Sequence, residues 1–91
     1  MYMNTHTKTS AIRRLRIIEG QVRGLQKMID DDAYCIDAIT QASAIKEAIS
    51  GVEDLLLENH LATHVIEQIK HSNEQQAIDE ILKVYKLKRK K

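Results

Sequence analysis

The scarcity of turn-forming residues constrains the fold of this chain more than any other feature. Its 91 residues include no proline and only three glycines, at positions 20, 24 and 51. Because strands are joined by turns that usually need Gly or Pro, the sequence predicts an all-α protein. The length predicts a single domain over residues 1–91, with a thin core. There is no Trp or Phe, and a small helical chain of this kind gains stability by packing against copies of itself. We therefore expect a homo-oligomer.

The first predicted helix is marked by apolar residues that recur at alternating steps of three and four. We expect it to begin at Ser10, with Thr7 or Thr9 as alternative N-caps. Gly20 and Gly24 lie inside it at a cost of about 1 kcal/mol each, which predicts close approach of another helix. The apolar stripe consists of Leu15, Ile18, Val22, Leu25 and Ile29.

The second predicted helix is much longer than the first. The acidic run at 30–32 ends the first pattern, and the second extends over about residues 33–69, with Gly51 as the expected place for a bend. A helix of this length predicts the spine of an antiparallel dimer or a larger bundle such as a dimer of dimers. Residues 72–75 match an S-x-x-Q capping box, so Ser72 is predicted to open a third helix.

The near-neutral net charge of +1 hides a segregated distribution. Residues 1–27 hold six Lys/Arg against one acid, residues 28–80 hold two against twelve, and residues 81–91 hold six and no acid. A surface of one sign favours a partner of the other. An arginine-rich first helix with one compensating acid therefore predicts contact with DNA phosphates, although a solvated basic face is the alternative. Its arginines are Arg13, Arg14, Arg16 and Arg23.

One cysteine and two histidines carry the most distinctive chemistry. His60 and His64 are spaced i, i+4, so on a helix their imidazoles lie on one face. Imidazole and thiolate together suit Cu(I), Zn(II), Ni(II) or Co(II). Cys35, however, would lie about 37 Å from His60 along an unbroken helix. The three could bind one metal only if an antiparallel second subunit brings its Cys35 beside the neighbour's histidines. A solvated histidine pair and a buried apolar cysteine are the alternative interpretations.

Enzymatic function is not expected. A Cys–His nucleophile pair needs an orienting residue, an oxyanion donor and a cleft, and a short three-helix chain has little room for them. His6 and His71 are expected to be solvent-exposed. A single cysteine, no signal-peptide pattern and no long apolar run predict a cytoplasmic protein without a membrane segment.

Three segments resemble the motifs of one protein family. Residues 14–24, RLRIIEGQVRG, resemble the R-L-x-x-x-x-G-Q-x-x-G opening of the CsoR/RcnR family of bacterial metal- and formaldehyde-responsive transcriptional repressors. Residues 32–37 and 41–44 resemble its second motif, and residues 59–64 its third. The resemblance implies a homotetramer of α-helical protomers that binds operator DNA when ligand-free and releases it when ligand binds.

The resemblance also implies roles for individual residues. Cys35 matches the thiolate ligand, His60 the shared imidazole, and His64 the third ligand, which is Cys in the best-known copper sensors. Tyr34 and Glu80 match an outer pair of copper-responsive members, expected to lie near His60. Arg14 and Arg16, two of the four arginines above, match basic positions used on DNA.

Differences between this sequence and the family patterns indicate which metals are expected first. The Cys-His-His set is more acceptable to divalent ions than Cys-His-Cys. Nickel and cobalt sensors add an N-terminal histidine where this chain has Met3, with His6 out of register. Formaldehyde sensors have an N-terminal proline where this chain has Tyr2. The sequence thus predicts Cu(I) first, Ni(II) or Co(II) second and Zn(II) after them.

The predicted function is a copper-responsive repressor of metal efflux or resistance genes. The alternatives are a nickel/cobalt- or formaldehyde-responsive repressor, a metal-buffering bundle that does not bind DNA, and a helical interaction module without a ligand.

Overall fold

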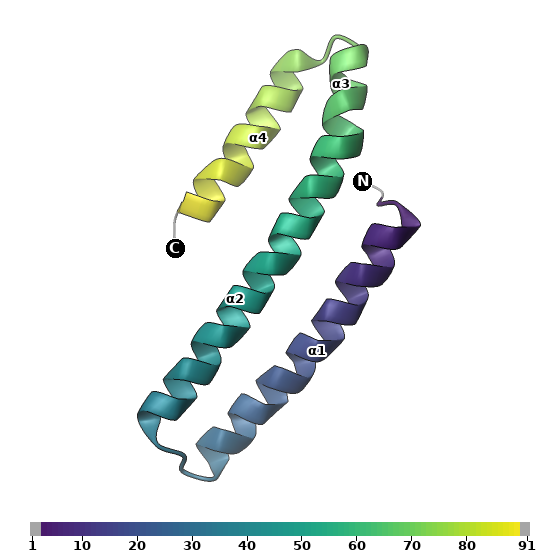
Figure 1. Ribbon diagram of the computed structural model, residues 1–91. Coiled ribbons are helices and arrows are strands. Elements are labelled where there is room, and N and C mark those ends of the chain that lie inside the picture. Colours follow the sequence, from purple (N-terminus) through teal and green to yellow (C-terminus); the bar gives the residue numbers. More distant parts are fainter. Residues whose placement is uncertain (1–2, 90–91) are drawn as a thin grey trace. The chain divides into compact units, whose positions relative to one another are not determined.

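The computed structural model describes residues 3–89 and is all-helical over that range (Figure 1). The helices are α1 (Thr5–Asp30), α2 (Cys35–His60), α3 (Ile66–Lys70) and α4 (Glu74–Arg89), and a π-helical turn, η1 (Leu61–Val65), joins α2 to α3. Tyr2 and the two C-terminal lysines lie outside the described residues. The predicted all-α fold with a long central helix is confirmed.

The chain divides after Glu58 into two compact units, Met1–Glu58 and Asn59–Lys91. The first contains α1 and most of α2, which form an antiparallel helical hairpin (Figure 1). The second contains the end of α2, together with η1, α3 and α4. A single domain over residues 1–91 remains a prediction.

The first helix begins earlier than predicted. Its N-cap is Asn4, whose Oδ1 accepts a hydrogen bond from the Thr7 backbone N–H at 2.8 Å. Ser10, Thr7 and Thr9 all lie inside α1, so none of these three predicted caps is correct. Asn is as good an N-cap as Ser, and it precedes the apolar pattern by more than two turns.

The turns after α1 and after α3 have the same geometry. Asp32 and Ser72 adopt left-handed backbone conformations, with φ values of 58° and 60°. After α1, the Asp32 N–H donates to the Ile29 carbonyl and the Ala33 N–H to the Met28 carbonyl, which together form a Schellman motif. The corresponding bonds follow α3 around Ser72. Ser72 therefore follows His71, the C-cap of α3, as the left-handed residue of this motif, and the prediction that it opens the next helix is wrong.

The predicted second helix is one helical run with an irregular segment near its end. It begins at Cys35, two residues later than expected, and continues through η1 and α3 to Lys70. Gly51, the expected bend, lies within α2. The departure from α-helical hydrogen bonding lies ten residues further on, at Leu61–Val65.

The glycines of α1 have open space around them. A Cβ placed on Gly20 would meet only the Arg23 side chain, at 3.9 Å, and one on Gly24 would meet nothing within 4 Å. The close helix–helix approach predicted at these positions therefore does not occur between the described helices. At Gly51, by contrast, a Cβ would lie 3.7 Å from Arg14 Nη1, so the Arg14 guanidinium lies over α2.

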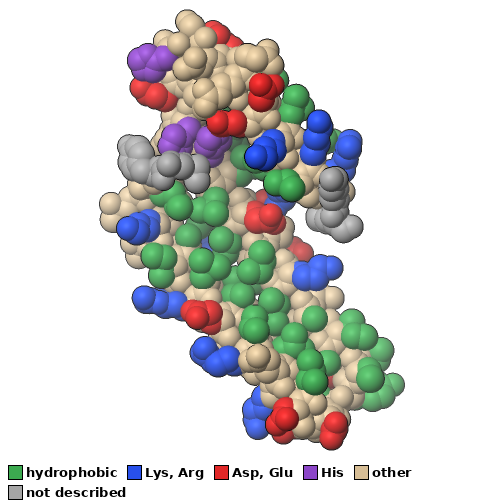
Figure 2. All heavy atoms as spheres, turned by 180° about the vertical axis from the view of Figure 1, so that it is seen from behind, with side chains coloured by type: hydrophobic (Ala, Val, Ile, Leu, Met, Phe, Trp, Pro, Cys, Tyr) green, Lys and Arg blue, Asp and Glu red, His purple; other side chains and the backbone are tan. Residues whose placement is uncertain are grey.

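Much of the predicted apolar stripe remains accessible in the single chain. Ile18 of α1 is buried, but Leu15 and Val22 are each 40% exposed and Ile39 of α2 is 59% exposed. Figure 2 shows hydrophobic side chains gathered in a band over the part of the molecule that holds α1 and α2. Contiguous apolar surface of this kind marks an interaction face, as the predicted oligomer requires.

Candidate metal centre

The two predicted imidazole ligands lie together within the second unit. His60 is the last residue of α2, and His64 belongs to the π-helical turn that follows. Their rings are stacked, with centroids 5.2 Å apart and planes inclined by 18°. The prediction that an i, i+4 spacing places both imidazoles on one face is confirmed. A π-helical turn inside a longer helix is frequent at functional sites, and here it carries one of the two imidazoles.

The stacking has a consequence for metal binding. An imidazole nitrogen donates through a lone pair that lies in the ring plane, so two nearly parallel stacked rings do not direct their lone pairs at a common point. One ring or both must turn before His60 and His64 can bind the same ion. A group that holds either ring would therefore influence how readily the two imidazoles bind one ion.

Glu80 of α4 holds the His60 ring from one side. Its Oε2 lies 2.9 Å from His60 Nε2, and the His60 side chain is only 18% exposed. The contact has an ion-pair distance but lacks hydrogen-bond geometry at Nε2. A carboxylate can only accept, so this contact favours a proton on that nitrogen. The lone pair of a neutral His60 is then on Nδ1.

Glu80 is itself held by two amides. Gln68 Nε2 donates to Glu80 Oε2 and Gln76 Nε2 donates to Glu80 Oε1, each at 3.2 Å. These two hydrogen bonds, and secondarily the charge of His60, hold the pKa of Glu80 below the ordinary glutamate range. The carboxylate therefore stays ionised beside the imidazole. Neither glutamine was predicted from the sequence. The i, i+4 spacing of Gln76 and Glu80 could have predicted the Gln76 contact. No sequence pattern indicates the contact of Gln68.

Thr63 is a second unpredicted neighbour of the histidine pair. Its Oγ1 donates to the Asn59 carbonyl oxygen at 2.7 Å and lies 3.0 Å from His64 Nδ1. Asn59 is buried, with 5% of its surface exposed. His64 is thus held by a threonine in the same turn, and His60 by a glutamate from another helix.

The predicted thiolate ligand and its outer partner lie in the first unit. Cys35 is the first residue of α2 and is a free, exposed cysteine. Tyr34 directly precedes α2, is 71% exposed and accepts the first backbone hydrogen bonds of that helix. Within residues 3–89 of one chain, no three His, Cys, Asp or Glu side chains are grouped so that they could hold a metal.

The remaining histidines are exposed, as expected. His6 lies in the first turns of α1, and His71 Nε2 lies 2.9 Å from Glu67 Oε1. Neither joins His60 and His64 in a metal-binding group.

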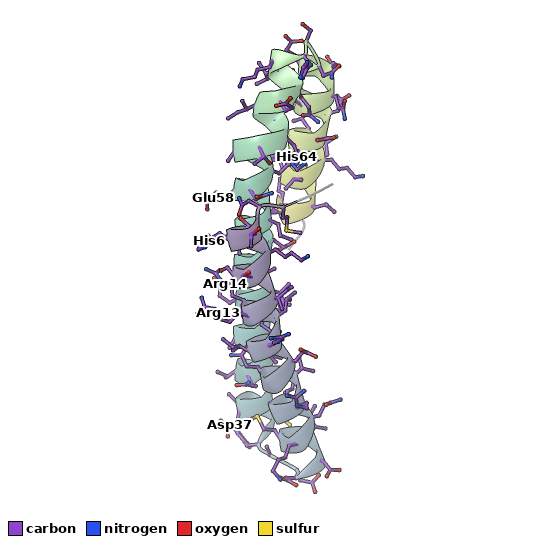
Figure 3. All side chains as sticks on the ribbon, turned by 90° about the vertical axis from the view of Figure 1, so that its right-hand side faces the viewer. His6, Arg13, Arg14, Asp37, Glu58 and His64 are labelled. Atoms are coloured by element: carbon purple, nitrogen blue, oxygen red, sulfur yellow. The ribbon has the colours of Figure 1, made fainter. Side chains whose placement is uncertain are left out.

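The four predicted DNA-binding arginines are all exposed on α1 but do not share one face. By helical periodicity Arg13, Arg16 and Arg23 lie roughly 140° or more around the helix from the buried Ile18, whereas Arg14 lies roughly 40° from it. Figure 3 shows Arg13 and Arg14 on successive positions of α1. The basic surface therefore extends around the helix towards α2.

Comparison with known proteins identifies the fold and the family. A family model described as "metal-sensitive transcriptional repressor" matches residues 7–86. The chain belongs to this family of metal-sensitive transcriptional repressors. The predicted resemblance to the CsoR/RcnR repressors is confirmed, as is the prediction of a transcriptional regulator rather than an enzyme.

Individual members of the repressor family match over most of the chain. The copper-sensing transcriptional repressor CsoR of Bacillus subtilis is 41% identical over 85 residues, which cover 93% of this chain and 84% of that protein. RicR, a copper-sensing repressor of Mycobacterium tuberculosis, is 48% identical over 58 residues, 64% of this chain and 60% of that protein. The crystal structure of the copper-sensing repressor CsoR with Cu(I) from Geobacillus thermodenitrificans superposes with a TM-score of 0.89 at 38% identity, covering 99% of this chain and 94% of the other.

None of the described helices is both long enough and apolar enough to cross a membrane.

Proposed function

We propose that this repressor binds operator DNA in its metal-free form and releases it when Cu(I) binds, so that metal efflux or resistance genes are expressed. It would do so in the cytoplasm as a homo-oligomer, a dimer that pairs into a tetramer. The observation that carries the proposal is the pair of stacked imidazoles, 5.2 Å apart, at the end of α2 in a chain of the metal-sensitive repressor family. The copper-sensing descriptions of its relatives support Cu(I) as the metal.

The proposed ligands are Cys35 of one protomer and His60 and His64 of its neighbour. Cys35 and His60 are the first and last residues of α2, so antiparallel pairing of two α2 helices would place a thiol beside the other chain's imidazoles. The exposed apolar band on α1 and α2 supports such a pairing. These donors fit Cu(I), because thiolate and imidazole are ligands that this ion accepts. Bound Cu(I) would supply charge and fixed geometry to the subunit interface.

The protein's own residues would convert metal occupancy into release of DNA. Glu80 is proposed to transmit a turn of the His60 ring to α4, and Tyr34 to complete the outer contacts from the other protomer. Cys35 must lose its proton to bind, so occupancy weakens as the pH falls. Shifting the repressor from 99% bound to 99% free requires about 5.5 kcal/mol of differential metal affinity.

The operator-binding surface is proposed to include the four arginines of α1. They are exposed, they lie in a segment with a single acid, and no base-reading helix-turn-helix pattern accompanies them. Contacts of this kind position a protein on the phosphate backbone and on DNA shape. The arginines proposed for this role are Arg13, Arg14, Arg16 and Arg23.

Nickel or cobalt is the second candidate for the sensed metal. Replacing a thiolate by the His64 imidazole leaves one sulfur and two nitrogen donors, a set that divalent ions accept more readily than two thiolates. Zn(II) would use the same donors.

A gel-shift experiment with DNA from upstream of the chain's own gene separates these possibilities. We expect the metal-free protein to shift the DNA, and Cu(I) to release it at lower concentration than Ni(II) or Co(II). Release by Ni(II) alone would select the second candidate, and release by formaldehyde alone would exclude a metal sensor. Cu(I) binding without any DNA shift would indicate a metal-buffering bundle instead. With neither a shift nor metal binding, the protein would be a helical interaction module.

A further inference from the structure

A short chain of hydrogen bonds ends on His64. The Thr63 hydroxyl donates to the Asn59 carbonyl oxygen at 2.7 Å, and the same hydroxyl oxygen lies 3.0 Å from His64 Nδ1. Thr63 and His64 both belong to the π-helical turn, and Asn59 is buried one turn before it. A threonine that bonds back to the carbonyl four residues earlier is held in one rotamer, so its oxygen has a fixed position.

The direction of this chain determines where the imidazole proton lies. A hydroxyl has one proton, and the proton of Thr63 is already given to a carbonyl, which can only accept. Towards His64 the Thr63 oxygen can therefore only accept, and His64 Nδ1 must bear the hydrogen. In a neutral imidazole the lone pair is then on Nε2.

The contacts at the two histidines favour opposite tautomers. Glu80 faces Nε2 of His60, which leaves the lone pair on Nδ1. Thr63 faces Nδ1 of His64, which leaves the lone pair on Nε2. Because each neutral imidazole has one lone pair, the choice of tautomer decides which nitrogen of each ring can bind an ion.

We propose that Thr63 is a positioning residue of the metal site. Its hydroxyl holds His64 in the Nδ1–H tautomer and thereby selects Nε2 as the donor to Cu(I). The inference rests on the proposed function in so far as His64 is a ligand. It concerns His64, the ligand position at which the best-known copper sensors have Cys. A thiolate has a single donor atom, whereas an imidazole has two nitrogens, of which one must be chosen as the donor.

The test compares Thr63→Val, which keeps the shape and removes the hydroxyl, with Thr63→Ser, which keeps the hydroxyl. In metal-free full-length protein, at a pH where both imidazoles are neutral, ¹⁵N NMR of the histidine side chains reports each tautomer directly. We expect Nδ1–H for His64 in the wild type and in Thr63→Ser, and a substantial Nε2–H population in Thr63→Val. His60 should remain Nε2–H in all three, which serves as the internal control for an intact fold.

Competition of the same proteins with a chelator for Cu(I) gives the second measurement. Loss of a partner that orients a metal ligand weakens binding by about tenfold or more. We expect that loss in Thr63→Val and wild-type affinity in Thr63→Ser. A wild-type His64 that is mainly Nε2–H overturns the proposal, and so does a Thr63→Val protein whose tautomer changes while its Cu(I) affinity does not. The NMR measurement contains no metal or DNA, so its outcome is separate from failure of the repressor function, which the gel shift detects.

Discussion

His60 Nε2 lies 2.9 Å from Glu80 Oε2, and this contact ties the last residue of α2 to the middle of α4. The two residues are 20 positions apart, and the turn at residues 71–73 brings them together. Gln68 and Gln76 donate to the same carboxylate, so Glu80 lies between the His60 imidazole and two amides. One of the two candidate imidazole ligands therefore contacts the C-terminal helix directly.

Removal of the thiol should separate DNA binding from metal response. We expect Cys35→Ala to bind operator DNA as the wild type does and to remain bound when Cu(I) is added, because the strongest donor is missing. Titration of Cu(I) into the protein–DNA complex, followed by gel shift, measures this. Alanine at the exposed Ser43 of α2 is a matched control and should release DNA normally. Release of DNA from Cys35→Ala by Cu(I) would contradict the assigned ligand set.

Loss of a phosphate contact should be visible in the salt dependence of DNA binding. Arg16→Ala is expected to weaken binding and to reduce the slope of log K against log salt by about 0.9, the contribution of one neutralised phosphate. Lys70→Ala removes an exposed positive charge from α3, outside α1, and should leave the slope unchanged. Equal slopes for wild type and Arg16→Ala would place the DNA surface elsewhere.

Glycine at the turn between α3 and α4 should stabilise the protein. Ser72 has a φ of 60°, a conformation that costs an L-residue roughly 1–2 kcal/mol and glycine almost nothing. After subtraction of glycine's greater loss of backbone entropy, Ser72→Gly is expected to raise the free energy of unfolding by about 0.5–1 kcal/mol. Urea unfolding measures the change, with Ser72→Ala as the control that should not stabilise. A destabilised Ser72→Gly protein would mean that the serine side chain makes an essential contact.

The contribution of Glu80 should depend on pH in a defined direction. The pKa of Glu80 is lowered in the folded protein, first by the Gln68 hydrogen bond, then by Gln76 and His60. Its ionised form is therefore favoured by folding, and the stabilisation is fully present above the unfolded pKa of about 4.3 and is lost as the pH falls through the folded value. The wild type should be more stable than Glu80→Gln at neutral pH, and the difference should shrink in acid. Thermal unfolding of both proteins across this range tests it, and a difference that grows with acidity would contradict it.

The sequence by itself determined the all-α class, the long central helix and the facing of His60 and His64. Each of these depends on local rules: the absence of proline, the period of the apolar residues and the i, i+4 spacing on a helix. The family motifs lie in the same short segments, so the order of residues alone is enough to identify them.

Only the tertiary structure decided which groups surround the imidazoles and where the helices begin and end. The two amides on Glu80 belong to different helices, and a turn has to bring them together before they can share one carboxylate. Asn and Ser side chains suit several roles near helix ends. The backbone angles in the structure show that Asn4 is the N-cap of α1 and that Ser72 adopts the left-handed conformation of a turn. The π-helical turn that contains His64 was likewise found only in the structure, since no local rule distinguishes Leu61–Val65 from the α-helix that precedes it.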